Sequence, residues 1–117
     1  MKKKILFVDD DRSIQEDIAD LLPADKVEVL SAFTIAEAEK LFAENDDIAL
    51  IVLDGCVDGD KFDTLPLLQK MRETFTGPIL AASNAPPLND LLMEGGCSDF
   101  ADGKSKVPSK IIEILGL

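Results

Sequence analysis

The chain has 117 residues, 46% of them hydrophobic, which is enough to form the core of one globular domain. Its 23 acidic residues against 12 Lys and Arg give a formal charge of -11, which repels phosphate backbones and anionic lipids, so nucleic acid and membrane are excluded as partners. No apolar run approaches the ~20 residues of a membrane span and no signal peptide is recognised, so we expect a cytoplasmic protein.

The first part of the chain alternates short apolar runs with helical stripes, a pattern typical of βαβ units. Strands are predicted over Lys4 to Asp9 and over Val27 to Ser31. A helix between them ends before Pro23, and Thr34 is placed to cap a second helix. The apolar side chains predicted to face inward from these two helices are Ile14, Ile18, Leu21, Leu22, Ile35, Ala38, Leu41 and Phe42.

Three further units follow. The strands are predicted over Ala49 to Leu53, Ile79 to Ala82 and Ser98 to Ala101. The helix after the third strand is predicted to end before Gly77 and tolerates Pro66 only in its first turn. Its apolar side chains at helical spacing are Phe62, Leu65, Leu68, Met71 and Phe75. The last two helices are short; one runs from Pro86-Pro87 through Leu88, Leu91 and Leu92 to Gly95-Gly96, and the other covers Pro108 to Leu115.

Five such rounds predict an α/β fold, with a five-stranded parallel sheet that is doubly wound, meaning covered by helices on both faces. We find no linker, repeat or second domain, so residues 1–117 are expected to act as a single module. In a sheet of this kind the ligand site lies beyond the carboxyl ends of the strands, where the strand order changes direction. The residues that follow the first, third, fourth and fifth strands are therefore the candidates for a site.

Acidic residues follow two of these strands. The first strand runs into Asp9, Asp10 and Asp11, and the third runs into Asp54. If the two strands are neighbours they lie about 5 Å apart, so their carboxylates converge and repel one another unless a cation or a proton neutralises them. Oxygen ligands favour a hard divalent ion, whereas a chain with two cysteines and no histidine lacks the ligands for a zinc site.

Ser83 after the fourth strand and Lys104 after the fifth complete a set suited to phosphoryl transfer. Asp54 is the better nucleophile because it stands alone at its strand end, whereas Asp9 and Asp10 are adjacent and can share a magnesium ion. Ser83 would donate a hydrogen bond to one phosphoryl oxygen and Lys104 would pair with another. Cys56 and Cys97 have no neighbouring cation to activate them and are predicted to be structural thiols.

The whole chain resembles the receiver domain of two-component response regulators. The resemblance is carried by Lys4-Ile5-Leu6-Phe7-Val8-Asp9-Asp10-Asp11, by Leu50-Ile51-Val52-Leu53-Asp54, by Pro78-Ile79-Leu80-Ala81-Ala82-Ser83 and by Gly96-Cys97-Ser98-Asp99-Phe100. It implies a flavodoxin-like (βα)5 fold with strand order 2-1-3-4-5. It also implies a phosphorylatable switch that accepts a phosphoryl group on Asp54 and has no turnover activity as an enzyme.

The same resemblance implies roles for individual residues. Asp10, Asp54 and the backbone carbonyl of Cys56 would bind Mg²⁺ directly, and Asp9 would act through water. Ser83 would be the switch hydroxyl and Phe100 the switch aromatic. The partners implied are a sensor histidine kinase or a phosphotransfer protein upstream, and a downstream protein that reads the face of the fourth helix, fifth strand and fifth helix.

Four positions depart from the receiver pattern. Asp58 stands where a proline is usual, and Asn84 stands where a very small residue normally lets the phosphodonor in. The lysine comes four residues after Phe100 rather than three, and Ser105 replaces the proline expected after it. Lys104 reaches the site only if Asp102-Gly103 forms a bulge; otherwise Lys106 or no lysine serves.

Two other interpretations remain open. Asp9-Asp10-Asp11 together with Ile79 to Asn84 is similar to the first two motifs of haloacid-dehalogenase-like phosphatases, in which Asp9 would be the nucleophile and Asp11 the acid. That interpretation gives Asp54 no role, and the chain is short for such an enzyme. The other is a degenerate receiver that binds a partner without phosphorylation, an interpretation favoured by Asp58, Asn84 and the displaced Lys104.

Overall fold

The computed structural model describes residues 1–117 and contains one parallel sheet with the strand order β2-β1-β3-β4-β5. The predicted doubly wound α/β fold and its strand order are confirmed. The strands are β1 (Lys3–Val8), β2 (Val27–Ala32), β3 (Ile48–Leu53), β4 (Ile79–Ala81) and β5 (Asp99–Phe100). The helices are α1 (Arg12–Asp20), α2 (Ile35–Glu44), α3 (Leu65–Arg72), α4 (Pro86–Gly95) and α5 (Val107–Leu115), with a short 3-10 turn, η1 (Lys104–Lys106), before α5.

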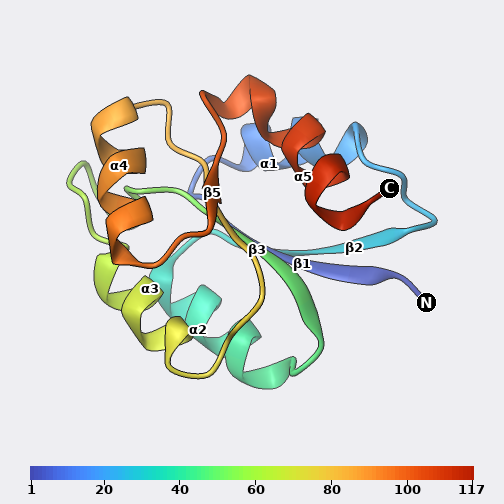
Figure 1. The fold of residues 1–117 in the computed structure, drawn as a ribbon, viewed down its shortest axis with the longest axis horizontal. Helices are drawn as coiled ribbons and strands as arrows, with labels where there is room; N and C mark the ends of the chain where they lie inside the picture. The colour runs from blue at the N-terminus through green and yellow to red at the C-terminus, as the bar shows by residue number, and fades with distance from the viewer.

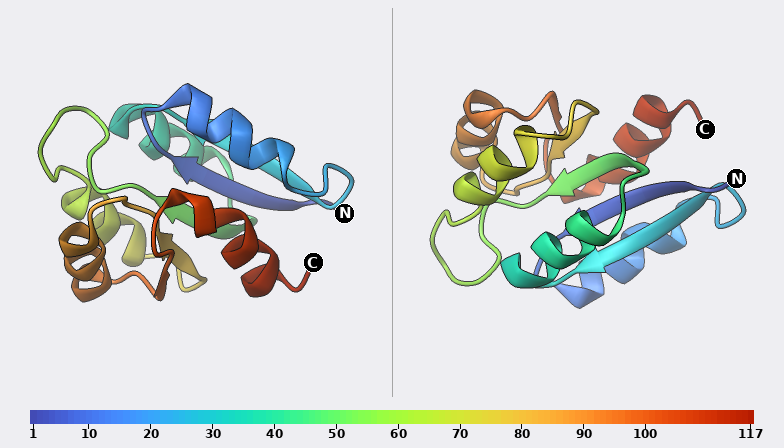
Figure 2. Two further views of the ribbon diagram at one scale, coloured as in Figure 1. Left: turned by 90° about the horizontal axis from the view of Figure 1, so that it is seen from above. Right: turned by 90° about the horizontal axis from the view of Figure 1, so that it is seen from below.

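Helices cover both faces of the sheet (Figure 1). The side chains of β1 divide between these two faces. Ile5 and Phe7 pack with α1 and α5, whereas Leu6 and Val8 pack with α2, α3 and α4. All four side chains are buried, because successive residues of a strand point to opposite faces of the sheet and helices cover both faces. In Figure 2, the view from above shows α1 and α5 in front of the strands, and the view from below shows α2 and α3 in front of them.

The sheet register brings the ends of β1 and β3 side by side. Val8 pairs with Leu53, and the Asp54 N–H donates to the Val8 carbonyl at 3.0 Å, so the residues after both strands emerge together. Leu53 pairs in turn with Ala81, and Ala81 with Phe100. Each of the four strand ends that were predicted to carry site residues therefore lies at one edge of the sheet.

Several local predictions hold and several are wrong. Thr34 caps α2 through a hydrogen bond from the Glu37 N–H at 3.1 Å, and Pro66 lies in the first turn of α3. The third helix is shorter than predicted, because Phe62 precedes its start at Leu65 and Phe75 follows its end. Leu21 does not face inward: it follows the last residue of α1 and is 67% exposed.

The bounds of the strands differ from the predicted ones by one or two residues. The predicted bounds were Lys4 to Asp9, Val27 to Ser31, Ala49 to Leu53, Ile79 to Ala82 and Ser98 to Ala101 for the strands, and Pro108 to Leu115 for the last helix. Each is corrected to the bounds given above. Apolar runs mark what is buried, whereas the bounds of a strand follow its backbone pairing and differ by a residue at either end. Asp9, for example, lies beyond β1 although it is fully buried and its N–H donates to the Ala32 carbonyl at 3.1 Å.

Candidate functional site

An acidic cluster lies at the carboxyl ends of β1 and β3. Asp9, Asp10 and Asp54 each offer a carboxylate oxygen, and these oxygens lie within 4.8 Å of one another. Asp9 and Asp54 are buried whereas Asp10 is exposed, so the cluster opens to solvent on one side. Oxygen donors of this kind and number fit a hard divalent cation such as Mg²⁺.

The Lys104 ammonium lies in this cluster. Its Nζ is 2.6 Å from Asp9 Oδ2 and 3.2 Å from Asp54 Oδ2, and only 14% of its side chain is exposed. The residue before it, Gly103, has φ +90°, a left-handed backbone conformation that side chains disfavour. Glycine therefore accommodates the extra residue in this loop. The Lys104 side chain reaches the acids, but Asp102 and Gly103 form a bend after β5 and not a bulge in the strand.

Burial and like charge perturb the acids of the cluster. Burial, followed by the negative charge of Asp9, raises the pKa of Asp54 from 3.8 to about 6, although Lys104 opposes the change. Burial also raises the pKa of Asp9, against the hydrogen bond from Lys104. Burial lowers the pKa of Lys104, but its hydrogen bond to Asp9 and the charge of Asp54 outweigh this effect, and the pKa is raised. One lysine thus offsets only part of the negative charge, which leaves a place for another cation.

The loop after Asp54 is held by groups that the sequence analysis did not identify. The buried Thr64 hydroxyl donates to the Asp54 carbonyl at 2.8 Å, and the Gly55 N–H donates to Asp54 Oδ1 at 2.8 Å. The two oxygens of Asp63 accept hydrogen bonds from the Val57 and Asp58 N–H groups, both at 2.9 Å. Thr64 stands just before α3, where its residue type suggests a helix cap, so the sequence carries no separate sign of this contact.

Gln15 performs the equivalent task on the β1 side and was also missed. Its buried amide nitrogen donates to the carbonyls of Phe7, Asp9 and Ala32 at 2.9–3.2 Å, which ties the ends of β1 and β2 to α1. A polar residue on a predominantly apolar helix face is the available signal. Asp11 caps α1 by accepting from the Ile14 N–H at 3.1 Å, so its carboxylate has a local structural partner.

Ser83 is buried and follows β4, the strand that neighbours β3. Its hydroxyl oxygen accepts a hydrogen bond from the Ala85 N–H at 3.1 Å, and its backbone is held on both sides by Asn89. Asn89 also donates to the Ala101 carbonyl at 3.2 Å, so one buried amide ties together the segments that follow β4 and β5. No hydrogen bond joins Ser83 to Asp54 in this structure.

The remaining predicted residues lie around this cluster. The Cys56 carbonyl, two residues after Asp54, accepts no hydrogen bond from the protein, and the pKa of its thiol is raised by burial and then by Asp54. Cys97 is buried, which raises the pKa of its thiol to about 12. Phe100 is 44% exposed and so is not a core residue. Asp58 accepts from the Ile35 N–H at 2.9 Å, which gives this departure from the receiver pattern a role at the start of α2.

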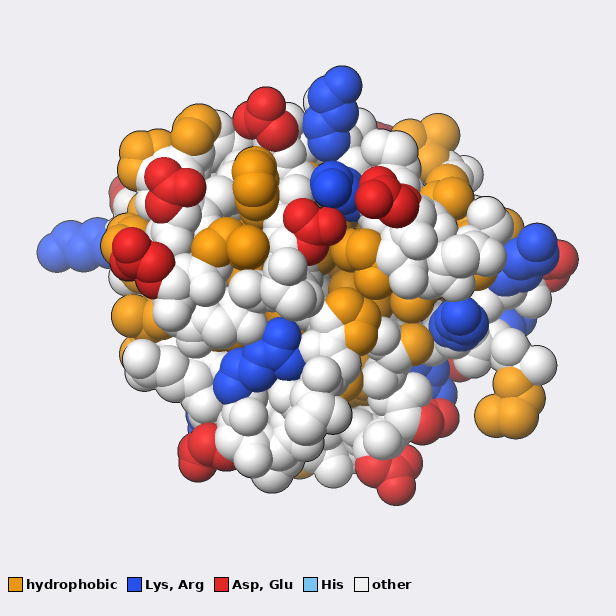
Figure 3. All heavy atoms as spheres, viewed as in Figure 1, with side chains coloured by type: hydrophobic (Ala, Val, Ile, Leu, Met, Phe, Trp, Pro, Cys, Tyr) orange, Lys and Arg blue, Asp and Glu red, His pale blue; other side chains and the backbone are white.

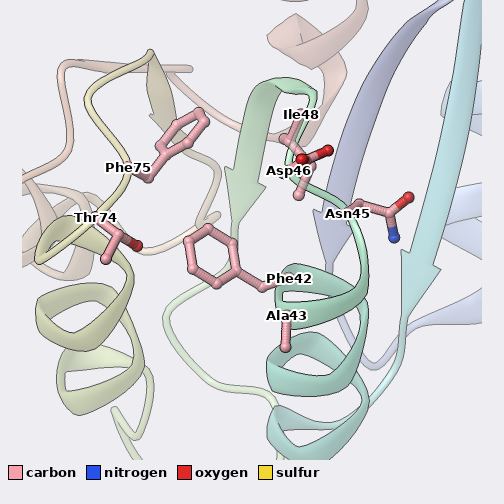
Figure 4. Close-up of a pocket in the computed structure, with 7 residues that line it drawn as sticks. All are labelled: Phe42, Ala43, Asn45, Asp46, Ile48, Thr74 and Phe75. Atoms are coloured by element: carbon pink, nitrogen blue, oxygen red, sulfur yellow. The ribbon is translucent and has the colours of Figure 1, made fainter.

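A separate surface pocket of about 320 Å³ lies near the opposite, amino end of β3 (Figure 4). It is lined by Phe42, Ala43, Asn45, Asp46, Ile48, Thr74 and Phe75. The Phe42 and Phe75 rings meet edge to face with centroids 6.2 Å apart. The pocket carries a single carboxylate and no lysine or arginine, so it lacks the convergent charges of the acidic cluster.

Acidic and basic side chains are interspersed over the face seen in Figure 3, without a continuous basic patch. With the net charge of -11, this distribution opposes nucleic-acid binding through phosphates. None of the helices combines the length and the apolar character that crossing a bilayer requires.

Response regulators and their receiver domains are among the solved structures that share this fold. A response regulator from Burkholderia pseudomallei, described with a phosphorylated aspartic acid and a calcium ion, matches 97% of this chain with a TM-score of 0.81 and 20% identity. A CheY-like receiver domain protein from Methanospirillum hungatei matches 99% of the chain and 95% of its own length, with a TM-score of 0.79 and 24% identity. The BeF3-activated receiver domain of RstA from Klebsiella pneumoniae matches 97% of the chain and 96% of its own length, with a TM-score of 0.78 and 26% identity.

The chain spans only part of some of these proteins: 66% of the Burkholderia protein and 26% of NtrX from Brucella abortus. No protein-family model matches the sequence, and no curated protein matches it. The fold comparison therefore supports the resemblance seen in the sequence, over nearly the whole chain.

Proposed function

We propose that this chain is a phosphorylatable signalling switch that accepts a phosphoryl group on Asp54. The observation that supports this best is the geometry at Asp54. A buried carboxylate with a raised pKa stands at the end of β3, within 4.8 Å of two other acids and 3.2 Å from an ammonium. The fold shared with receiver domains gives the same cluster a signalling context.

The proposed donor is the phosphohistidine of a sensor kinase or of a phosphotransfer protein. A carboxylate oxygen of Asp54 attacks phosphorus, the bond from phosphorus to the imidazole nitrogen breaks, and that nitrogen keeps the electron pair. Lys104 and Ser83 each pair with a phosphoryl oxygen of the product. The Thr64 hydroxyl and the Gly55 N–H hold Asp54 in position for the attack.

The acids present fit a magnesium ion. Asp9, Asp10, Asp54 and the Cys56 carbonyl would hold it, and it would supply positive charge for the phosphoryl oxygens. Asp9 and Asp54 are fixed by their surroundings, whereas Asp10 is exposed and free to adjust to the ion. We propose Mg²⁺ as the cofactor because it favours carboxylate and carbonyl oxygens and leaves room for water and phosphate.

Output would pass through protein contact in the cytoplasm. Phe100 on β5 and Leu91 on α4 are both exposed, and β4, which Ser83 follows, lies between β3 and β5 in the sheet. Phosphorylation would shift the populations of Ser83 and Phe100 conformers, which a downstream protein reads. The chain's own chemistry would be limited to accepting the phosphoryl group and hydrolysing the aspartyl phosphate, without turnover as an enzyme.

The test is incubation with acetyl phosphate and Mg²⁺, followed by intact mass measurement and mapping of the modified residue. We expect one phosphoryl group on Asp54 and none in the Asp54→Asn variant. Trapping with beryllium fluoride provides a second assignment of the acceptor. Modification of Asp9 instead would favour the hydrolase interpretation, and no modification of any carboxylate would favour a binding module that works without phosphorylation.

A further inference from the structure

Two loops meet beside the acidic cluster, and one side chain joins them. The loop after β4 contributes Asn84, and the loop after β5 contributes Gly103 and Lys104. The Lys104 backbone N–H donates to Asn84 Oδ1 at 2.8 Å. Asn84 itself is exposed, so packing does not explain why it holds this position.

The Asn84 side chain supplies a hydrogen-bond acceptor that the Lys104 N–H otherwise lacks. Lys104 begins the η1 turn, and the first N–H groups of any helical turn have no acceptor within it. Two nearby N–H groups find acceptors inside the loop: the Gly103 N–H donates to the Ala101 carbonyl at 2.9 Å, and the Lys106 N–H donates to the Gly103 carbonyl at 3.1 Å. The acceptor for the Lys104 N–H, by contrast, comes from Asn84, outside the loop that follows β5.

We propose that Asn84 is a positioning residue for Lys104, which it fixes through the backbone so that the ammonium lies between Asp9 and Asp54. The proposal rests on the proposed function and adds a residue to it. It also relates two departures from the receiver pattern, because the residue that is larger than usual reaches the loop that is one residue longer than usual. Small errors in the placement of a charged group are costly in phosphoryl transfer, which depends on positioning.

Asn84 therefore has two opposing effects on the reaction. We expect its bulk to narrow access to Asp54, as the departure from the receiver pattern implies, and its carbonyl oxygen to order the lysine that pairs with the phosphoryl group. The two effects can be separated, since leucine has nearly the same shape as asparagine but accepts no hydrogen bond. Aspartate has the same shape and keeps the acceptor. Asn84→Leu thus removes only the tether, and Asn84→Asp retains it.

The experiment measures how fast an amine-reactive acylating reagent modifies Lys104 in the metal-free protein, with Lys106 and Lys110 as references in the same sample. We expect Lys104 to react about fivefold faster in Asn84→Leu, the effect of losing one hydrogen bond. In Asn84→Asp it should react no faster than in the wild type, because the acceptor is kept and the added negative charge favours the unreactive ammonium form. The two reference lysines should react at their wild-type rates, and the melting temperature should fall by no more than about 5 °C, the effect of the same lost hydrogen bond. Phosphorylation of Asp54 by acetyl phosphate should slow by a similar factor in Asn84→Leu.

The proposal would be overturned if Lys104 in Asn84→Leu reacted at the wild-type rate. It would also be overturned if Lys104 reacted faster while Asp54 was phosphorylated at the wild-type rate. Equal acceleration at all three lysines would also overturn it, because a general loosening of the fold would then be the cause. Should the wild-type chain take no phosphoryl group on Asp54, the proposed function would fail. The labelling comparison would still decide whether Asn84 positions Lys104.

Discussion

At the amino end of the sheet the rings of Phe42 and Phe75 meet edge to face, whereas at the carboxyl end two buried carboxylates share one ammonium. Arg72 completes the amino end by donating to the carbonyls of Phe75, Gly77 and Gly96 at 2.6–3.0 Å, which satisfies backbone groups of two loops. The polar groups of the carboxyl end are less well compensated. The pKa of Asp54 is raised, and Gln15 Oε1 is buried without a hydrogen-bond partner.

The difference indicates where the chain gains stability and where it keeps a reactive site. Apolar contacts and satisfied carbonyls stabilise the amino end at little electrostatic cost. Buried charges of one sign destabilise the carboxyl end until a cation, a proton or a phosphoryl group changes the charge balance. We therefore expect ligands and pH to act at the carboxyl end, and expect truncation of apolar side chains to act at the amino end.

The largest expected effect concerns the pH dependence of stability at Asp54. Its pKa is about 6 in the folded protein and 3.8 in the absence of the fold, so protonation favours the folded state. This stabilisation is complete below pH 3.8 and is lost as the pH rises through about 6. The difference corresponds to at most about 3 kcal/mol, roughly half of which is expected to appear between pH 8 and pH 5.

The measurement is urea unfolding of the wild type and of Asp54→Asn across this range. Asp54→Asn should be the more stable protein at pH 8, and its advantage should shrink as the pH falls. Parallel pH profiles for the two proteins would contradict the electrostatic strain that we assign to the carboxyl end.

A smaller effect is expected from Phe75→Ala at the amino end. Phe75 is half-buried, and its removal deletes the edge-to-face contact with Phe42, so the free energy of unfolding should fall by about 2 kcal/mol. The rate of Asp54 phosphorylation should not change at temperatures where the variant is folded. A stable variant with altered phosphorylation would show that the two ends are coupled, against the separation described above.

The smallest effect is the response of the melting temperature to Mg²⁺. Binding to the folded state alone gives about 1.4 kcal/mol when the metal is at ten times its Kd, or about 5 °C for a domain of this size. The reference must be NaCl at the same ionic strength, because screening alone stabilises a chain with a charge of -11. Asp10→Asn should lose most of the shift, and the matched variant Asp60→Asn, at an exposed acid outside the cluster, should keep it.

The order of the strands and helices could be predicted because apolar periodicity reports burial directly. β1 and β3 are continuous apolar runs since both faces of the sheet are covered, and the acids that follow them mark the edge where the strands end. Leu21 was misplaced because it continues the apolar stripe one residue beyond the last residue of α1. Phe62 and Phe75 were misplaced for the same reason, since they pack against the core from loops beside α3.

Which polar residues support the site could not be predicted in the same way. Thr64, Gln15 and Asn84 act through hydrogen bonds to backbone groups that are distant in sequence, and their residue types are common at helix caps, on helix faces and in turns. The reach of Lys104 was also open, because an extra residue in a loop turns the side chain away unless the backbone adopts an unusual conformation.

The sequence by itself determined the α/β class, the number of strands and the edge at which the acids gather, because these depend on which residues are apolar and on where each run stops. Only the tertiary structure decided that Lys104 meets Asp9 and Asp54, and that Thr64 and Asn84 hold the loops around them. The physical reason is that a hydrogen bond or an ion pair depends on distances of a few tenths of an ångström between segments far apart in the chain. Residue order alone carries no such distances.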